Sequence, residues 1–178
     1  PGKITTGQIV FVLAPRINAV GRMGDATRAV DLLTCTDEAT ADGLSQVLEE
    51  ENRNRRKIDE VTFQQAQDIV EDGSQGNGGP AIVLHNELWH PGVIGMVASR
   101  LVDWFSKPSV LIALDNGVGK GSARGIRTFD MLEGLKYCSG LLDRFGGHKA
   151  AAGLTVSIGN LAAFRDEFIR YANDALTD

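Results

Sequence analysis

Two short glycine-rich segments hold the residues of this sequence that are best suited to bind an anion. In the segment GKGSARGIR, Ser122 and Arg124 are separated by one residue, so on a strand both side chains lie on the same face. An arginine fork and a serine hydroxyl on one face can converge on one anion, and Lys120 would share that face. The alternative interpretation is an edge strand with polar side chains turned to solvent, which is common.

The second segment is FGGHKAAAG, in the C-terminal third of the chain. Gly146 and Gly147 permit positive φ and a close approach of backbone N–H groups to a ligand, as in phosphate-binding loops. His148 and Lys149 would add donors beside them. A tight helix-to-strand turn with small residues explains this segment about equally well. The two segments together favour an anion pocket.

The segment LHNELWHPGVIG offers two histidines and a carboxylate, His85, His90 and Glu87. Their spacing matches no zinc pattern, so a metal site is the weaker interpretation. We expect His90 and Pro91 to form a strand-to-helix turn, where the helix N-terminus favours a nearby anion. Trp89 could stack on a base, but a position in the core is the safer expectation.

A third arginine-containing segment, APRINAVGRM, places Arg16, Asn18 and Arg22 around a turn shaped by Pro15 and Gly21. Surface arginines alone are a weak signal. The sequence has no cluster of aspartates and histidines that could hold two Mg²⁺ or Mn²⁺ ions for phosphodiester hydrolysis. It also has no GxSxG, HExxH or P-loop motif.

Composition limits the class of protein. The 178 residues are 43% hydrophobic, which suffices for one ordinary domain or one domain with a smaller attachment. The net charge of -5 means that nucleic-acid binding would need a local basic patch. Cys35 and Cys138 form no CxxC motif and are expected to be buried free thiols. With no membrane-spanning apolar run and no signal-peptide pattern, we predict a soluble cytoplasmic protein.

The N-terminal part is predicted to be helical. After a strand-like apolar run within the first twenty residues, a helix is expected from about residue 25. A long helix then runs over residues 36–72, with Thr36 as N-cap and the pairs Glu49–Arg53 and Glu51–Arg55 along its polar middle. Because its two ends are apolar and its middle is polar, we interpret this helix as a connector that crosses solvent between two bodies. The alternative is an ordinary hairpin helix whose polar middle is simply its solvated face.

The C-terminal part follows an α/β pattern after a glycine-rich linker, residues 73–80. A βαβ unit should make its first two strands parallel through a right-handed crossover. The fold class is therefore α/β: a helical N-terminal segment with a long connector helix, then a small α/β domain with a mixed sheet. The expected strands cover residues 81–85, 108–114, 117–126 and 153–158, and the expected helices cover 91–105, 129–145 with a break near Ser139 and Gly140, and 161–176.

Taken together, four segments resemble the RecJ exonucleases, the single-strand-specific 5′→3′ members of the DHH phosphoesterase family. The similar segments are APRINAVGRMGDATRAVDLL, LWHPGVIGMVASRLV, GKGSARGI and FGGHKAAAGLTV, in the family's order and over nearly the whole chain. The GGHxxAAG pattern alone is shared more widely, by small oligonucleotide phosphodiesterases and, in related form, by alanyl-tRNA synthetase. The arginine-containing turn and the WHPGVIG segment indicate the RecJ type.

The resemblance implies a division of the chain and a role for each part. Residues 1–35 would be the tail of the DHH catalytic domain, 36–72 the connector helix, 73–80 the linker and 81–178 the DHH-associated domain. The DHH motif is missing here, so Mg²⁺ or Mn²⁺ would bind in the catalytic domain of the parent protein, with no cofactor in this chain. The expected partners are that missing DHH lobe and single-stranded DNA, preferably 5′-phosphorylated, and no membrane.

The resemblance also implies roles for the residues singled out above. Ser122 and Arg124 would grip the 5′-terminal phosphate, helped by Arg22 or, as second choice, Arg16. His148 would bind the scissile phosphate, and the residues around it would line the substrate face: Gly146, Gly147, Lys149 and Lys120.

The parent would thus be a metal-dependent exonuclease of DNA repair and recombination, and this chain alone is expected to bind DNA without cutting it. Two alternatives stay open: a related phosphodiesterase acting on short oligonucleotides or nucleotides, and a non-catalytic nucleic-acid-binding or partner-docking module.

Overall fold

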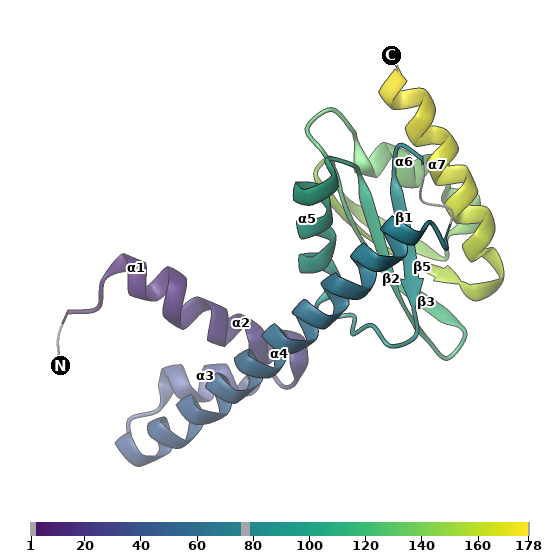
Figure 1. The fold of residues 1–178 in the computed structure, drawn as a ribbon. Helices are drawn as coiled ribbons and strands as arrows, with labels where there is room; N and C mark the ends of the chain where they lie inside the picture. Colours follow the sequence, from purple (N-terminus) through teal and green to yellow (C-terminus); the bar gives the residue numbers. More distant parts are fainter. Residues whose placement is uncertain (1–2, 76–78, 178) are drawn as a thin grey trace. The chain divides into compact units, whose positions relative to one another are not determined.

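The computed structural model describes residues 3–75 and 79–177, which form two compact units that divide at Ile58 and Asp59. The first unit is helical, and the second contains the sheet (Figure 1). Part of the expected linker, residues 76–78, lies outside the described residues. Helices of the first unit are α1 (Thr6–Gln8), the π-helical turn η1 (Ile9–Leu13), α2 (Ala14–Met23), α3 (Thr27–Thr34) and the beginning of α4 (Glu38–Asp72).

The second unit combines five strands with helices, and the end of α4 belongs to it. Its strands are β1 (Ile82–Asn86), β2 (Ser109–Asp115), β3 (Val118–Arg124), β4 (Arg144–His148) and β5 (Ala151–Ser157). Its helices are α5 (Ile94–Phe105), α6 (Met131–Tyr137), the 3-10 turns η2 (Ser139–Leu141) and η3 (Ile158–Asn160), and α7 (Leu161–Thr177).

The apolar run near the N-terminus is helical, so the expected strand was wrong. Thr5 and Gln8 form a capping box, in which the Gln8 backbone N donates to the Thr5 hydroxyl at 3.3 Å and the Thr5 N donates to the Gln8 side chain at 2.9 Å. A strand needs a neighbour for its backbone groups, whereas a helix satisfies them within itself. The capped first turn therefore continues through Ile9–Leu13 into α2, and these apolar side chains are largely exposed.

Helix α4 begins at Glu38, and its cap is Asp37 instead of the expected Thr36. The Asp37 carboxylate accepts hydrogen bonds from the Thr40 backbone N at 2.8 Å and from its hydroxyl at 2.6 Å. The hydroxyl and then the backbone N–H of Thr40 hold the pKa of Asp37 below its usual range. A carboxylate fits this position because it also faces the positive end of the helix dipole.

The middle of α4 holds the first unit together. Leu48 is buried against Val20 of α2 and Ala29 of α3. Glu49 and Glu51, expected to pair along α4, instead accept from Arg16 and Arg28 of the neighbouring helices (arginine–glutamate N–O distances 2.5 Å and 3.4 Å). The spacing of residues predicted ion pairs within α4, because the sequence alone does not show which helices pack beside it.

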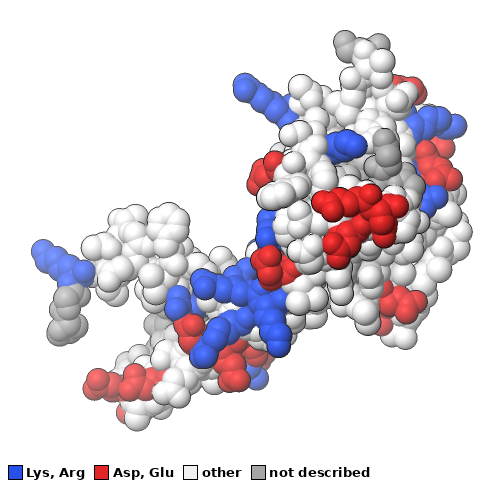
Figure 2. Space-filling view, in the orientation of Figure 1, with Lys and Arg blue, Asp and Glu red and all other residues white. Residues whose placement is uncertain are grey.

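Beyond Ile58, α4 packs in the second unit, and its expected role as a connector stays a prediction. Phe63 and Ala66 are buried with residues of α5 and of the sheet. Figure 2 shows basic side chains gathered over the middle of α4 and acidic ones near its C-terminal end. The exposed charged residues of α4 include Arg53, Arg56 and Lys57 in its middle and Glu71 and Asp72 at its C-terminal end.

The sheet has the order β1-β2-β3-β5-β4 and is mixed, as predicted. β1 and β2 are parallel, joined through α5, and every other neighbouring pair is antiparallel. The break expected near Ser139 is present, since α6 ends at Tyr137 and a 3-10 turn follows. The fifth strand, β4, was missed because its residues were assigned to the end of that helix and to a turn.

Two apolar cores lie on the two faces of this sheet. Leu111 and Ala113 pack with α5 and α4 on one face, and Val110 and Ile112 pack with α6 and α7 on the other. Figure 1 shows α5 and α7 on opposite sides of the strands. The α7 core includes Phe164 and Phe168, as its helical spacing predicted. None of the helices among the described residues is long and apolar enough to cross a membrane.

A glycine within α4 and a glycine just after it should respond in opposite ways to substitution by alanine. Gly43 is exposed within the helix and a Cβ there would meet nothing within 4 Å, so Gly43→Ala should stabilise the protein by about 0.5–1 kcal/mol. Gly73, just past the end of α4, has φ +68°, so Gly73→Ala should lower the free energy of unfolding. Urea unfolding measures both, and equal effects of the two substitutions would contradict this assignment.

Candidate anion-binding site on the sheet

Strand register brings most of the predicted site residues onto one face of the sheet. Residues directly opposite each other on antiparallel strands point to the same side, so β3, β5 and β4 form rows across that face. Leu111 and Ala113 of β2, which pack under α5, lie opposite Ser122 and Lys120, so this is the α5 face. Three rows follow: Arg124, Ala151 and His148; Ser122, Gly153 and Gly146; Lys120, Thr155 and Arg144.

Ser122 and Arg124 form the centre of the candidate site. Nη1 of Arg124 donates to the Ser122 hydroxyl oxygen at 2.9 Å and to the Ala123 carbonyl at 2.8 Å. Both side chains are partly buried. The guanidinium is therefore oriented before any ligand arrives, and the prediction that these two side chains lie together is confirmed.

Gly95, in the first turn of α5, is a residue of this site that sequence analysis missed. A Cβ on Gly95 would lie 2.8 Å from Nη2 of Arg124 and 2.9 Å from Oγ of Ser122. Only glycine lets the two side chains lie against the start of α5, where the helix dipole is positive. The glycine after WHPGVI was visible in the sequence. Its role in making room for Ser122 and Arg124 becomes apparent only from the packing of α5 on β3.

Gly146 and Gly147 lie on edge strand β4, so neither the loop nor the alternative helix-to-strand turn was correct for their backbone, and the two glycines differ in what they require. Gly147 has φ +150°, and a Cβ there would lie 2.5 Å from the Ala151 carbonyl oxygen. Gly146 has nothing within 4 Å of a Cβ, and a Cβ on the neighbouring Gly153 would meet only the Gly121 carbonyl oxygen at 3.8 Å. Packing thus explains Gly147, whereas the space above Gly146 and Gly153 is open for a ligand.

His148 and Lys149 are exposed at the end of β4. His148 shares the site face with Arg124, and both His148 and Lys149 line a hollow of about 460 Å³ with Gly125 and Arg127. Lys149 lies in the turn between β4 and β5, where its carbonyl accepts from the Met131 backbone N at 2.9 Å. Its backbone fixes the start of α6, while its side chain is not part of the three rows.

The two candidate arginines of the first unit have different surroundings. Nε of Arg16 pairs with Glu49, and its Nη1 donates to the Val12 carbonyl at 2.6 Å. Arg22 lines a hollow of about 460 Å³ with Asn18. The expected contact of either arginine with phosphate stays a prediction.

The segment around Trp89 is structural. Nε1 of Trp89 donates to Gln65 at 3.0 Å and the ring is buried, so the core interpretation is confirmed. Nδ1 of His90 accepts from the Gly92 backbone N at 3.0 Å in the turn before α5, which begins at Ile94 instead of at Pro91. Burial and then the nearby charge of Arg165 lower the pKa of His85.

No group of three or more His, Cys, Asp or Glu residues that could hold a metal ion occurs in the described part of the chain. Cys35 and Cys138 are free thiols, but only Cys138 is buried, so the expected burial was wrong for the half-buried Cys35. Burial raises the pKa of the Cys138 thiol to about 12. At neutral pH Cys138 is therefore protonated and a poor metal ligand. The residues described here do not fit a divalent metal.

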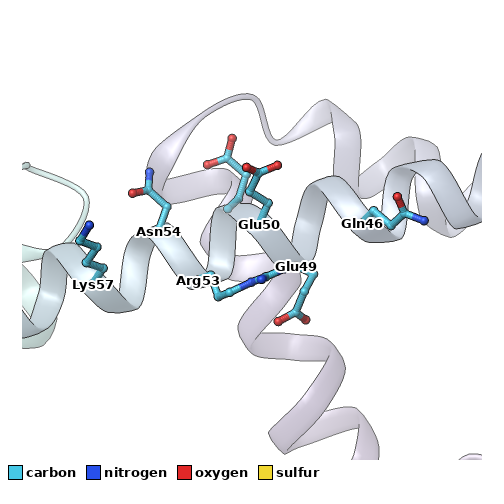
Figure 3. A pocket seen from close by; sticks show the side chains of 7 residues that line it. Gln46, Glu49, Glu50, Arg53, Asn54 and Lys57 are labelled. Atoms are coloured by element: carbon cyan, nitrogen blue, oxygen red, sulfur yellow. The ribbon is translucent and has the colours of Figure 1, made fainter.

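A third hollow, of about 840 Å³, lies beside α4 in the first unit (Figure 3). It is lined by charges of both signs, among them Glu50, Arg53 and Lys57. Figure 3 shows Glu50 and Arg53 leaving α4 on different sides. Such a mixture gives no concentrated charge of one sign, so the sheet face is the stronger anion-binding candidate.

A mixed sheet with helices on both faces and a glycine-bearing edge strand beside basic side chains defines a small α/β domain. Comparison with protein families identifies it: the DHHA1 domain matches residues 78–174, and the chain belongs to this family. The match covers the linker end, the whole sheet and most of α7.

The relatives are RecJ proteins, in agreement with the resemblance found in the sequence. The chain is 38% identical to the single-stranded-DNA-specific exonuclease RecJ of Bacillus subtilis, over 99% of this chain and 22% of the relative. It is 34% identical to that of Thermus thermophilus, over 93% of this chain and 23% of the relative. The chain therefore spans about a quarter of the length of these relatives.

Solved RecJ structures share the fold. The crystal structure of Thermus thermophilus RecJ with Mg²⁺ has a TM-score of 0.81 at 34% identity and covers 93% of this chain and 25% of that one. A structure of exonuclease RecJ bound to manganese has a TM-score of 0.83 at 33% identity and covers 98% of this chain and 44% of that one. The metals belong to those proteins.

The adjacent glycines of β4 should respond differently to substitution. Gly147→Ala should lower the free energy of unfolding by roughly 1–3 kcal/mol, because its φ and the Ala151 carbonyl leave no room for a Cβ. Gly146→Ala should change it by less than about 0.5 kcal/mol, since nothing lies within 4 Å. Denaturant unfolding of the two variants checks this, and similar losses in both would refute the distinction.

Proposed function

We propose that this chain is the substrate-binding part of a RecJ-type single-strand-specific 5′→3′ exonuclease, and that its sheet binds the 5′-phosphate and backbone of single-stranded DNA. One observation carries the proposal: the guanidinium of Arg124 is held by the Ser122 hydroxyl against Gly95 at the start of α5. The similarity to RecJ exonucleases over nearly the whole chain supports it.

Each group of the Ser122–Arg124 site has a separate task in binding phosphate. The Ser122 oxygen accepts from Arg124, so its own O–H hydrogen can be donated to a phosphate oxygen. Arg124 supplies a forked, permanently charged donor. The positive end of α5 adds a favourable dipole beside them. Because the guanidinium is oriented in advance, less side-chain entropy is lost when phosphate binds.

His148 is proposed to contact the scissile phosphate, because it lies in the same row as Arg124 on the open part of the face. Gly146, with open space above its backbone, lets the DNA strand approach β4 closely. Gly147 keeps β4 in the shape that presents both neighbours, and Lys149 contributes positive charge at the rim. We retain Arg22, with Arg16 as second choice, as a further phosphate contact in the parent protein.

In the parent protein, a catalytic DHH lobe binding Mg²⁺ or Mn²⁺ would activate the water that cleaves the phosphodiester. The residues of this chain would fix the strand end and neutralise its charge, which is a positioning role. The chain alone is therefore proposed to bind DNA in the cytoplasm without hydrolysing it.

Removing the guanidinium should abolish recognition of the strand end. Arg124→Ala should weaken binding of a 5′-phosphorylated oligonucleotide by about 1.5–3 kcal/mol, roughly ten- to hundredfold in Kd, and remove its advantage over a 5′-hydroxyl strand. Gly95→Ala should act in the same direction by displacing both side chains. Fluorescence anisotropy at low salt measures the Kd values.

Two variants serve as controls for these measurements. Arg170→Ala removes an exposed guanidinium on α7, on the other face of the sheet, and Gly140→Ala adds a Cβ where nothing lies within 4 Å. Both should bind like the unaltered chain. Equal binding of phosphorylated and unphosphorylated strands by the unaltered chain would contradict end recognition.

The length of the DNA strand and the Arg124→Ala variant each separate one alternative function from the proposed one. Affinity that stops increasing beyond two or three nucleotides would indicate a phosphodiesterase for short oligonucleotides. Affinity that does not change in Arg124→Ala would indicate a general binding or partner-docking module.

A further inference from the structure

The third row of the sheet face contains a basic pair that the Ser122–Arg124 site does not use. Lys120 on β3 and Arg144 on β4 both lie opposite Thr155 of β5, the strand between them. We propose that Lys120, Thr155 and Arg144 form a second phosphate-binding subsite, which holds the backbone of a single strand whose 5′ end occupies the Ser122–Arg124 site. This subsite rests on the proposed function.

The two cations are placed to share one phosphate. Neighbouring strands are about 4.8 Å apart, so the Cα atoms of Lys120 and Arg144 are separated by about 10 Å, with Thr155 between them. Side chains of this length can reach a phosphate above Thr155 from both sides. The Thr155 hydroxyl is positioned to donate to the same group.

The surroundings leave both cations available to a ligand. Lys120 and Arg144 are exposed, and neither has an ion-pair partner in the described part of the chain. This distinguishes them from Lys136, Arg165 and Arg170 of the same unit, which pair with nearby carboxylates.

A hollow of the right kind lies between the two cations. It measures about 410 Å³, reaches from Lys120 across Thr155 to Arg144, and includes Gly153. Above Gly153 the space is open, as the missing Cβ would meet only a carbonyl oxygen at 3.8 Å. A backbone can therefore lie close to the sheet there.

On its other side, Lys120 borders a hollow of about 260 Å³ that is also lined by Glu87 and Asp115. Two carboxylates would repel phosphate from that hollow. The charges thus favour a polyanion that runs from Lys120 towards Arg144, across the strands.

The distance from the first site fits the same DNA strand. Along β3, Lys120 lies about 7 Å from Ser122 and about 13 Å from Arg124, at about 3.3 Å per residue. A stacked single strand carries one phosphate per about 3.4 Å of its axis and an extended strand has a longer spacing, so phosphates a few positions from the 5′ end reach this row.

The test compares Lys120→Ala/Arg144→Ala with a control of equal charge change, Lys136→Ala/Arg170→Ala. The control residues lie on α6 and α7, on the opposite face. Binding of a 5′-phosphorylated 12-nucleotide strand and of a two-nucleotide strand is measured by anisotropy and competition over a range of salt concentrations. Thermal unfolding verifies that both double variants are folded.

We expect Lys120→Ala/Arg144→Ala to weaken binding of the 12-nucleotide strand while keeping the preference for a 5′-phosphate. The slope of log Kd against log salt concentration should decrease by about 0.7, the value for the one phosphate that the two cations would share. The two-nucleotide strand should bind nearly unchanged, because it does not reach the third row. Thr155→Val should weaken the 12-nucleotide strand less, since it removes a hydroxyl and no charge.

Each outcome of these measurements has a distinct meaning for the second subsite and for the proposed function. Equal behaviour of the two double variants, with 5′-phosphate preference retained, overturns the second subsite and leaves the proposed function standing. Loss of 5′-phosphate preference in Arg124→Ala combined with a weakened 12-nucleotide strand in Lys120→Ala/Arg144→Ala supports both. No measurable binding by the unaltered chain at low salt overturns both for this chain.

Discussion

Antiparallel pairing of β3, β5 and β4 decides which side chains can act together on this domain. Because side chains alternate between faces, the pairing of Ser122 with Gly153 and of Gly153 with Gly146 places three rows on the α5 face. A slip of one residue in β3 would turn Ser122 and Arg124 into the α7 core and bring Ala123 to the surface. The apolar residues of that core, among them Ala123 and Leu154, therefore fix the register on which the candidate site depends.

Small residues have two different purposes on this face. Gly95 and Gly147 are required by the protein itself, because any Cβ there would meet Arg124 and Ser122 or the β5 backbone within 3 Å. Gly146 and Gly153 are not crowded, so their lack of side chains opens the surface instead. Gly147 thus shapes the sheet and Gly95 orients the Arg124 guanidinium. Gly146 and Gly153 leave an uncovered area of backbone between cationic side chains.

Sequence periodicity predicted the mixed sheet, the parallel βαβ unit and α7, because each has several apolar residues at a regular spacing. It failed for β4, where glycines and charged residues give no apolar alternation and only pairing with β5 makes a strand. The motif GKGSAR predicted the Ser122–Arg124 pair from a spacing of two, a local relation. Gly95 and Arg144 were missed because their relation to that pair passes through α5 packing and through two strand pairings, which local spacing does not contain.

β4 is one of the two outer strands of the sheet, and its residues are exposed to solvent. A regular, flat edge of this kind tends to recruit a strand from another molecule. Arg144 and His148 at its two ends and the unusual φ of Gly147 make this edge short, charged and irregular. The same residues that favour an anion on the face of the sheet thus also oppose self-association through its edge, so replacing them with apolar residues would favour aggregation of the domain.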